Sequence, residues 1–140
     1  MASPVRPAAA IAWRSVGAAF AIDVVLVVVF AMIGRTSHAE QLTVAGVWQT
    51  AWPFLAGLVL GWLVTRPWRA PFAPVRTGIG LWAMTVVGGM LLRGVSGQGT
   101  AVAFIVVASI VLLVFLVGWR AIAALVARSR RTPTTAEATR

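Results

Sequence analysis

The sequence predicts an all-α integral membrane protein, a four-helix bundle with its N- and C-termini in the cytoplasm. Three observations lead to this fold class. Hydrophobic residues make up 60% of the 140 residues and charged residues only 11%, a composition that cannot supply the polar surface of a soluble domain. Four apolar runs of about membrane-spanning length are separated by short polar segments. The arginines lie at the ends of these runs and mostly on one side of the expected membrane.

The first apolar run covers about residues 13–33 and follows a short segment, 1–12, that we expect to be a cytoplasmic tail. Asp23 lies near the middle of the run, and Gly34 is placed to end the helix. A cleaved signal peptide is an alternative, because SHA at 37–39 would serve as a cleavage site. The length of the run and its central carboxyl favour a retained span.

The second and third runs predict an antiparallel helical hairpin. The second run, about 48–65, contains a GxxxG pair, Gly57 and Gly61, which would let another helix approach closely. The third run, about 77–92, is the shortest and most glycine-rich, so we expect it to pack inside the bundle. The basic loop between them, 66–76, is too short for any other connection.

The fourth run, about 100–119, is nearly unbroken aliphatic sequence, and we expect its helix to extend to about residue 128. The segment 129–140 is polar and low in hydrophobic residues, so we expect a disordered cytoplasmic tail. The spans and the extension together predict one transmembrane domain, 13–128.

The arginines predict the orientation. All 12 basic residues are arginines, and the net charge is +9. Because positive charges in short loops stay on the cytoplasmic side, we expect a multi-pass protein of the bacterial inner (plasma) membrane. Its cytoplasmic face would contact anionic lipids, and we expect no nucleic acid partner. The expected cytoplasmic arginines are Arg6, Arg14, Arg66, Arg69, Arg76, Arg120, Arg128, Arg130, Arg131 and Arg140, whereas Arg35 and Arg93 lie on the opposite side.

The residue inventory excludes most cofactor and enzyme chemistry. The chain has no Cys, no Tyr, no Lys and one His. Disulfides, thiol nucleophiles, iron–sulfur clusters, a bis-histidine haem, zinc sites and Lys Schiff bases are therefore excluded within one chain. We expect no metal, no cofactor and no catalytic residues, and we do not expect an enzyme.

Asp23 is the residue that most invites a functional interpretation. An ionisable group in the hydrocarbon centre costs several kcal/mol unless it is paired, solvated or protonated. At 1.5 Å per residue, Thr85 and Ser109 lie at the same depth, and Trp82 lies one turn from Thr85. These four residues predict a polar layer at the midplane. The layer fits either a proton- or cation-coupling carboxyl or a hydrogen bond that fixes helix packing.

A second candidate site lies on the outer face. Arg35 and His38 follow the first span, and Arg93 ends the third. Two arginines on a charge-poor face could hold a carboxylate or a phosphate, and a histidine beside them would titrate near neutral pH. The alternatives are that the arginines extend to lipid head groups and that Glu40 neutralises Arg35.

Several segments together resemble a known family. They are the Asp in span one, GRTSH after it, WPFLAGLVLGWLVT in span two, TGIGLW and GMLLR in span three, and GQGTAVAFIVVA opening span four. From about Asp23 to Trp119 the chain resembles small bacterial and archaeal four-span membrane proteins grouped as a domain of unknown function. The resemblance implies a shared membrane architecture and no activity. A weaker likeness is to small multidrug resistance transporters, from which only Asp23 carries over, and there the carboxylate is a Glu.

These observations lead to competing functions. The first is a non-catalytic scaffold or accessory membrane subunit, acting as a homo-oligomer or in a larger complex. The alternative is a proton- or ion-coupled small transporter or channel-like oligomer that uses Asp23. The third is an intramembrane enzyme on a phosphorylated lipid, but Asp23 and His38 lie far apart in depth and no DxxD-type cluster is present.

Overall fold

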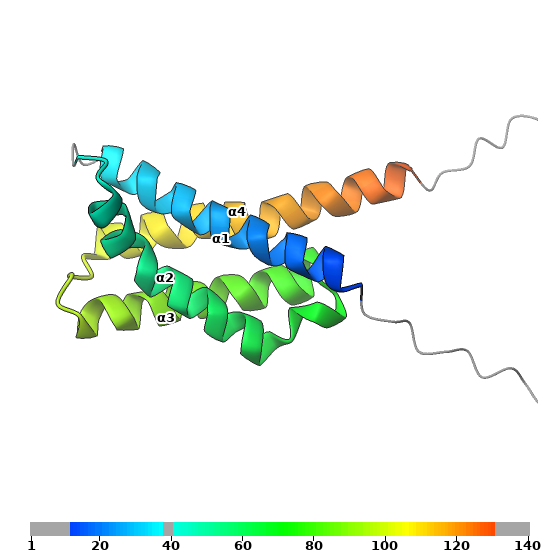
Figure 1. The fold of residues 1–140 in the computed structure, drawn as a ribbon, viewed down its shortest axis with the longest axis horizontal. Helices are drawn as coiled ribbons and strands as arrows, with labels where there is room; N and C mark the ends of the chain where they lie inside the picture. Colours follow the sequence, from blue (N-terminus) through cyan, green and yellow to red (C-terminus); the bar gives the residue numbers. More distant parts are fainter. Residues whose placement is uncertain (1–11, 38–40, 131–140) are drawn as a thin grey trace, which may run out of the picture.

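The computed structural model describes residues 12–37 and 41–130, so His38 and, of the expected terminal tails, residues 1–11 and 131–140 lie outside the described residues. That part of the chain forms four α-helices and no strand, and Figure 1 shows how the helices are arranged. The elements in order are α1 (Trp13–Ser37), α2 (Val44–Thr65), η1 (Pro67–Arg69), η2 (Pro74–Ile79), α3 (Gly80–Val95) and α4 (Val102–Ser129).

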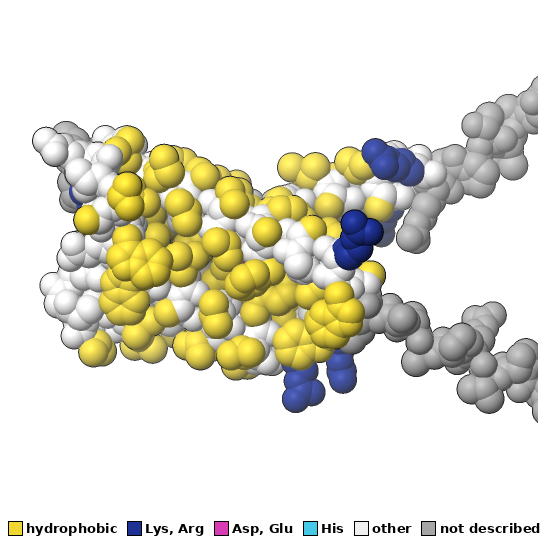
Figure 2. Space-filling view, viewed as in Figure 1, with side chains coloured by type: hydrophobic (Ala, Val, Ile, Leu, Met, Phe, Trp, Pro, Cys, Tyr) yellow, Lys and Arg dark blue, Asp and Glu magenta, His cyan; other side chains and the backbone are white. Residues whose placement is uncertain are grey.

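All four helical segments are long and apolar enough to cross a membrane. The third is composite, because the π-helical turn η2 leads directly into α3 and together they run from Pro74 to Val95. Figure 2 shows hydrophobic side chains spread over most of the outer face, as expected for a surface that contacts lipid. The all-α membrane four-helix bundle predicted from the sequence is confirmed.

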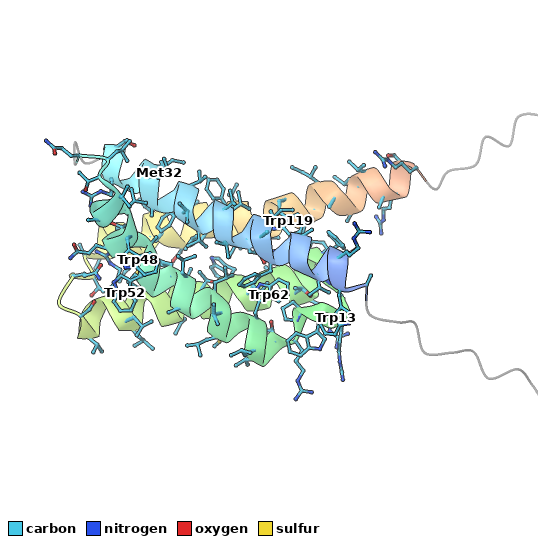
Figure 3. The ribbon with its side chains drawn as sticks, in the orientation of Figure 1. Trp13, Met32, Trp48, Trp52, Trp62 and Trp119 are labelled. Carbon is cyan, nitrogen blue, oxygen red and sulfur yellow. The ribbon has the colours of Figure 1, made fainter. Side chains whose placement is uncertain are left out.

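The two ends of the bundle differ in charge. We call the end where α1 begins and α4 ends the terminal end; it also carries the α2–α3 connection. The opposite, distal end carries the other two connections. Arginine side chains gather at the terminal end in Figure 2. Trp48 and Trp52 lie toward the distal end and Trp13 lies at the terminal end (Figure 3), as interfacial tryptophans do.

The helix limits at the distal end differ from those expected. Gly34 does not end α1, which continues to Ser37. The Thr36 hydroxyl donates to the carbonyl oxygen of Ile33 at 2.9 Å, which satisfies a carbonyl of the last turn. α2 begins before residue 48, because the Thr43 side chain accepts a hydrogen bond from the Gly46 N–H at 3.1 Å and caps the helix.

The limits at the terminal end also differ. The third span begins at Pro74, ahead of residue 77, because proline at the first helical position loses no helical hydrogen bond. α4 continues to Ser129 without a break, through Arg120. In Figure 1 its last turns extend beyond the other three helices.

α2 and α3 pack backbone to backbone along a seam of glycines. A Cβ atom at Gly57 would lie 2.9 Å from the Thr85 carbonyl oxygen and 3.0 Å from the Gly89 nitrogen. A Cβ atom at Gly61 would lie 3.0 Å from the Met84 Cβ atom. The prediction that the GxxxG pair admits another helix closely is confirmed, and the partner is α3.

Candidate functional sites

Asp23 is fully buried and belongs to a polar cluster formed by three helices. Its Oδ1 atom accepts hydrogen bonds from Trp119 Nε1 at 2.9 Å and Arg120 Nη1 at 2.8 Å. Its Oδ2 atom accepts from Trp62 Nε1 at 3.0 Å and Arg120 Nη2 at 2.7 Å. Four donors fill the acceptor sites of an ionised carboxylate, and two of them come from one guanidinium in the fork geometry that gives strong pairing. We call these four residues the carboxylate cluster.

Arg120 is as buried as Asp23, and both side chains are 0% exposed. Two of its three remaining N–H groups also find acceptors: Nη1 donates to the Leu116 carbonyl oxygen at 2.8 Å and Nε to the Pro71 carbonyl oxygen at 2.9 Å. The guanidinium also lies 4.6 Å from the ring centroid of Trp119. The cation therefore connects α1, α4 and the α2–α3 connection.

The carboxylate cluster lies on the terminal side of the centre of the bundle. Trp62 is about one helical turn, roughly 5 Å, before the end of α2. Pro71 belongs to the terminal-end connection. In Figure 3, Trp62 and Trp119 lie at a similar level along the bundle, on the terminal side of its centre. Asp23 itself lies near the middle of α1.

The other residues of the expected polar layer have different partners. Trp82 donates from Nε1 to the backbone carbonyl oxygen of Ser109 at 2.8 Å, which joins α3 to α4. Thr85 is fully buried, and within the described residues its hydroxyl has no hydrogen-bond partner. No hydrogen bond in this part of the chain links Asp23 to Thr85, Trp82 or Ser109. The structure brings Trp82 and Ser109 together, and the described hydrogen bonds of Asp23 go to other residues.

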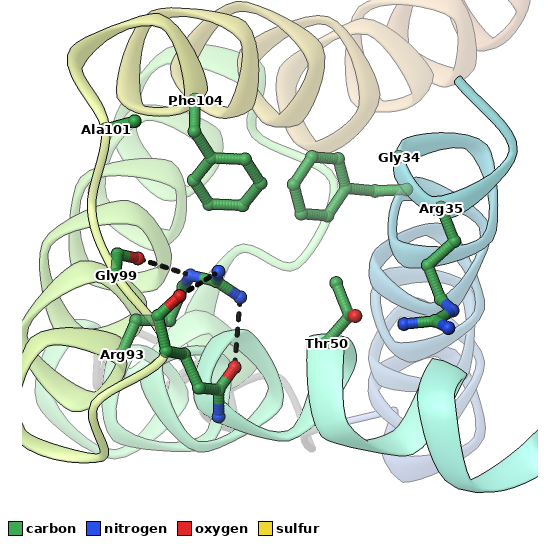
Figure 4. A pocket seen from close by; sticks show the side chains of 9 residues that line it. Gly34, Arg35, Thr50, Arg93, Gly99, Ala101 and Phe104 are labelled. Carbon is green, nitrogen blue, oxygen red and sulfur yellow. Dashed lines mark hydrogen bonds between the residues drawn. The ribbon is translucent and has the colours of Figure 1, made fainter. Parts of the chain in front are cut away.

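The distal end holds a cavity of about 310 Å³, which we call the distal pocket. This volume is at the lower end of the range for small-molecule sites. Figure 4 shows Arg93 and Arg35 on opposite sides of it, with Thr50 between them and Phe104 above. The lining residues are Phe30, Gly34, Arg35, Thr50, Arg93, Gln98, Gly99, Ala101 and Phe104. The structure therefore brings Arg35 and Arg93 to one pocket.

The two arginines of the distal pocket are held by neighbouring connections. Arg93 donates to the Gln98 side-chain oxygen at 3.0 Å and to the Gly99 carbonyl oxygen at 3.3 Å. Its guanidinium lies 4.3 Å from the ring centroid of Phe104. Arg35 donates to the Gln41 carbonyl oxygen at 2.9 and 3.2 Å. Both side chains line the pocket, and guanidinium groups are the donors that pair with a carboxylate or a phosphate.

Metal binding has no support in the described residues, which contain no group of three His, Cys, Asp or Glu side chains close enough to hold an ion. The anion site expected from the sequence included His38, which lies outside the described residues.

Comparison with protein-family models places the chain in a family. The model for a protein of unknown function, DUF3054, matches residues 20–123. The chain belongs to the DUF3054 family. No curated protein and no solved structure matches the chain. The family match spans the carboxylate cluster, from α1 to Arg120, and both arginines of the distal pocket. It confirms the resemblance to four-span proteins of unknown function.

Sequence reasoning on this DUF3054 chain assigned neither Trp62, Trp119 nor Arg120 to a site, although all three bond Asp23. Arg120 is the one of the three that the sequence singles out. It follows an aliphatic run and was grouped with the cytoplasmic arginines, yet seven apolar residues, AIAALVA, come after it. These are good helix formers, so the helix continues and Arg120 lies within it. The sequence therefore contained the information needed to pair Arg120 with Asp23. A buried carboxyl requires a partner, and Arg120 is the arginine that has apolar helix-forming sequence on both sides.

Proposed function

We propose that this protein is a non-catalytic scaffold or accessory subunit of the plasma membrane, in which Asp23 has a structural role. The observation that carries the proposal is the fully bonded carboxylate of Asp23. A coupling carboxyl must exchange a proton or an ion with a solvent path. Asp23 is 0% exposed and bonded to a guanidinium that is itself 0% exposed, which favours a structural ion pair.

The orientation we propose is the one with the terminal end in the cytoplasm. The support is the positive charge at that end: Arg66, Arg69 and Arg76 lie in the α2–α3 connection and Arg128 in the last turn of α4. Arg120 is excluded from this group because it is neutralised inside the bundle. Without Arg120, the terminal end still carries more arginines than the distal end, as the positive-inside rule expects for a cytoplasmic end. Partners would be anionic lipids, a second copy or a larger membrane complex.

The test is transport by the purified protein in liposomes loaded with a pH-sensitive dye. The comparison is between the wild type and the double variant Asp23→Asn/Arg120→Gln, in which two neutral amides replace the ion pair and no buried charge is left unpaired. We expect equal, background proton flux for both. Flux by the wild type that disappears in a folded double variant would instead establish the transporter alternative. The fold of each variant is checked by circular dichroism in the same lipid.

The distal pocket favours a second candidate function, recognition of an anionic solute or head group. Its support is the placement of Arg35 and Arg93 on facing walls. Calorimetric titration with acetate, phosphate and glycerol 3-phosphate tests it, with Arg93→Gln as the variant and Arg128→Gln as the control of equal charge. Binding that Arg93→Gln abolishes and Arg128→Gln retains would support it, whereas no binding by the wild type would exclude it.

A further inference from the structure

A second, smaller cavity lies at the terminal end, where α2 ends and the third span begins. Its volume is about 120 Å³, well below that of sites for drug-sized ligands. We call it the arginine pocket. It is lined by Thr65, Arg66, Arg69, Ala70, Arg76 and Thr77. A cavity of this size accommodates a single small charged group and not an extended ligand.

The arginine pocket is strongly cationic. Three of its six lining residues are arginines. Within residues 12–37 and 41–130, Asp23 is the only acidic residue, and its carboxylate is bonded to Arg120. No carboxylate of the described chain is therefore available to neutralise this pocket. The three side chains are exposed to solvent, and their charge favours an anionic ligand.

The connection that forms the pocket has a fixed shape. Arg120 Nε donates to the Pro71 carbonyl oxygen at 2.9 Å, and the buried Thr77 hydroxyl donates to the Ala70 carbonyl oxygen at 2.7 Å. Pro67 and Pro74 begin η1 and η2 and restrict the backbone further. Because these contacts hold the connection in place, binding would require little loss of backbone freedom.

Arg66 has a backbone conformation that costs energy. Its φ of 51° and ψ of 57° are left-handed, and it is the one non-glycine residue with positive φ in the described chain. Glycine is the usual residue at such a position after a helix. Strained backbone of this kind is concentrated at binding and catalytic sites. An arginine at this position therefore points to a requirement for its side chain.

We propose that the arginine pocket binds a phosphate monoester. A monoester carries a charge of about −1.5 to −2 near neutral pH, which suits three guanidinium groups better than the single charge of a diester. The pocket lies at the end of a membrane span, where lipid phosphates lie. The group is supplied either by a lipid head group such as phosphatidate or by a soluble phosphate monoester.

The experiment measures binding of the full-length protein in phosphatidylcholine nanodiscs. One series contains phosphatidate and a second contains phosphatidylglycerol, a diester of the same sign. A third adds glycerol 3-phosphate to pure phosphatidylcholine discs, and the readout in each is the change in melting temperature with ligand concentration. The variants are Arg66→Gln/Arg69→Gln/Arg76→Gln and, as the control with the same loss of charge, Arg14→Gln/Arg128→Gln/Arg130→Gln.

We expect the pocket variant to weaken phosphatidate or glycerol 3-phosphate binding at least about tenfold, the value of one charge-assisted hydrogen bond. The control variant should stay within about threefold of the wild type. Stabilisation by phosphatidate alone identifies a lipid source, and stabilisation by glycerol 3-phosphate identifies a soluble one. An equal loss in both variants would overturn the proposal, since it would reduce the effect to surface charge, and so would equal binding of the diester lipid.

The single substitution Arg66→Gly separates binding from folding. It relieves the left-handed strain and should raise the melting temperature without ligand, while ligand stabilisation falls. A variant that is more stable and binds as well as the wild type would show that Arg66 is not retained for its side chain and would overturn its assignment to the site.

Discussion

The α1–α4 contact and the α2–α3 seam are stabilised in opposite ways. Asp23 and Arg120 join α1 to α4 through a buried ion pair at 2.7 Å, with indole donors from α2 and α4 around it. The seam has no ion pair and depends on glycines that bring two backbones together. Because lipid tails are as apolar as leucine, apolar burial alone gives membrane helices little reason to associate. The bundle supplies a driving force for helix association in two ways, by the buried ion pair between α1 and α4 and by close backbone packing between α2 and α3.

The α1–α4 ion pair and the α2–α3 seam are sensitive to different kinds of substitution. The ion pair depends on two particular side chains, so losing one leaves an unpaired charge in the interior. The seam depends on the absence of side chains, so adding a methyl group forces the backbones apart. Three substitutions examine this difference, and they are ordered by the size of the expected effect.

Asp23→Asn should have the largest effect. It leaves the Arg120 guanidinium buried without its counter-charge, and loss of one partner of a buried pair costs about 3–5 kcal/mol. The free energy of unfolding in bicelles, measured by titration with dodecyl sulfate, reports the loss. Asp23→Asn/Arg120→Gln is the matched control and should regain most of it. A single variant within about 1 kcal/mol of the wild type would show that the pair contributes little.

Gly89→Ala should have the second largest effect. The added Cβ atom would collide with the ring of Phe54, which is fully buried and packs edge-on against Phe30 at 5.1 Å between ring centroids. Overpacking of this kind costs about 1–3 kcal/mol. Gly118→Ala is the control, because nothing lies within 4 Å of its Cβ position, and alanine there should stabilise α4 by about 0.5–1 kcal/mol. Equal effects of the two substitutions would contradict a tight seam.

Thr85→Val should have the smallest effect and the opposite sign. The Thr85 hydroxyl is buried without a hydrogen-bond partner in the described chain, and an isosteric methyl group removes that unfavourable desolvation. We expect the free energy of unfolding to rise by up to about 1 kcal/mol. Thr77→Val is the control, since its hydroxyl bonds the Ala70 carbonyl oxygen at 2.7 Å, and it should destabilise by about 1 kcal/mol. Destabilisation by Thr85→Val would indicate that its hydroxyl has a partner in the membrane.

The fold was predictable because its determinants are local. Each span is encoded by its own run of apolar residues, and the GxxxG pair in α2 predicted that another helix packs closely against it. The helix limits were less predictable. The cap at Thr43 and the passage of α1 through Gly34 depend on single side-chain contacts that hydropathy does not register.

The candidate sites were predictable only in part because they depend on how the helices are shifted along one another. Depth counting treats every span as centred in the membrane, which aligned Asp23 with Thr85 and Ser109. Asp23 lies near the centre of α1, but its partners Arg120 and Trp62 lie in the later halves of α4 and α2, so its partners are not the central residues of the other helices. Arg35 and Arg93 were easier to place together, because each lies at a helix end on the same side of the bundle.

The spacing of the ion pair along the chain has a consequence for synthesis. Arg120 follows Asp23 by 97 residues, so the first span is made long before the last. At about 5–20 residues per second, the carboxyl would wait about 5–20 s for its partner. During that interval an unpaired Asp favours a position beside the insertion machinery or in the aqueous interface over one in lipid. The Asp23–Arg120 ion pair can therefore form only after most of α4 has been made.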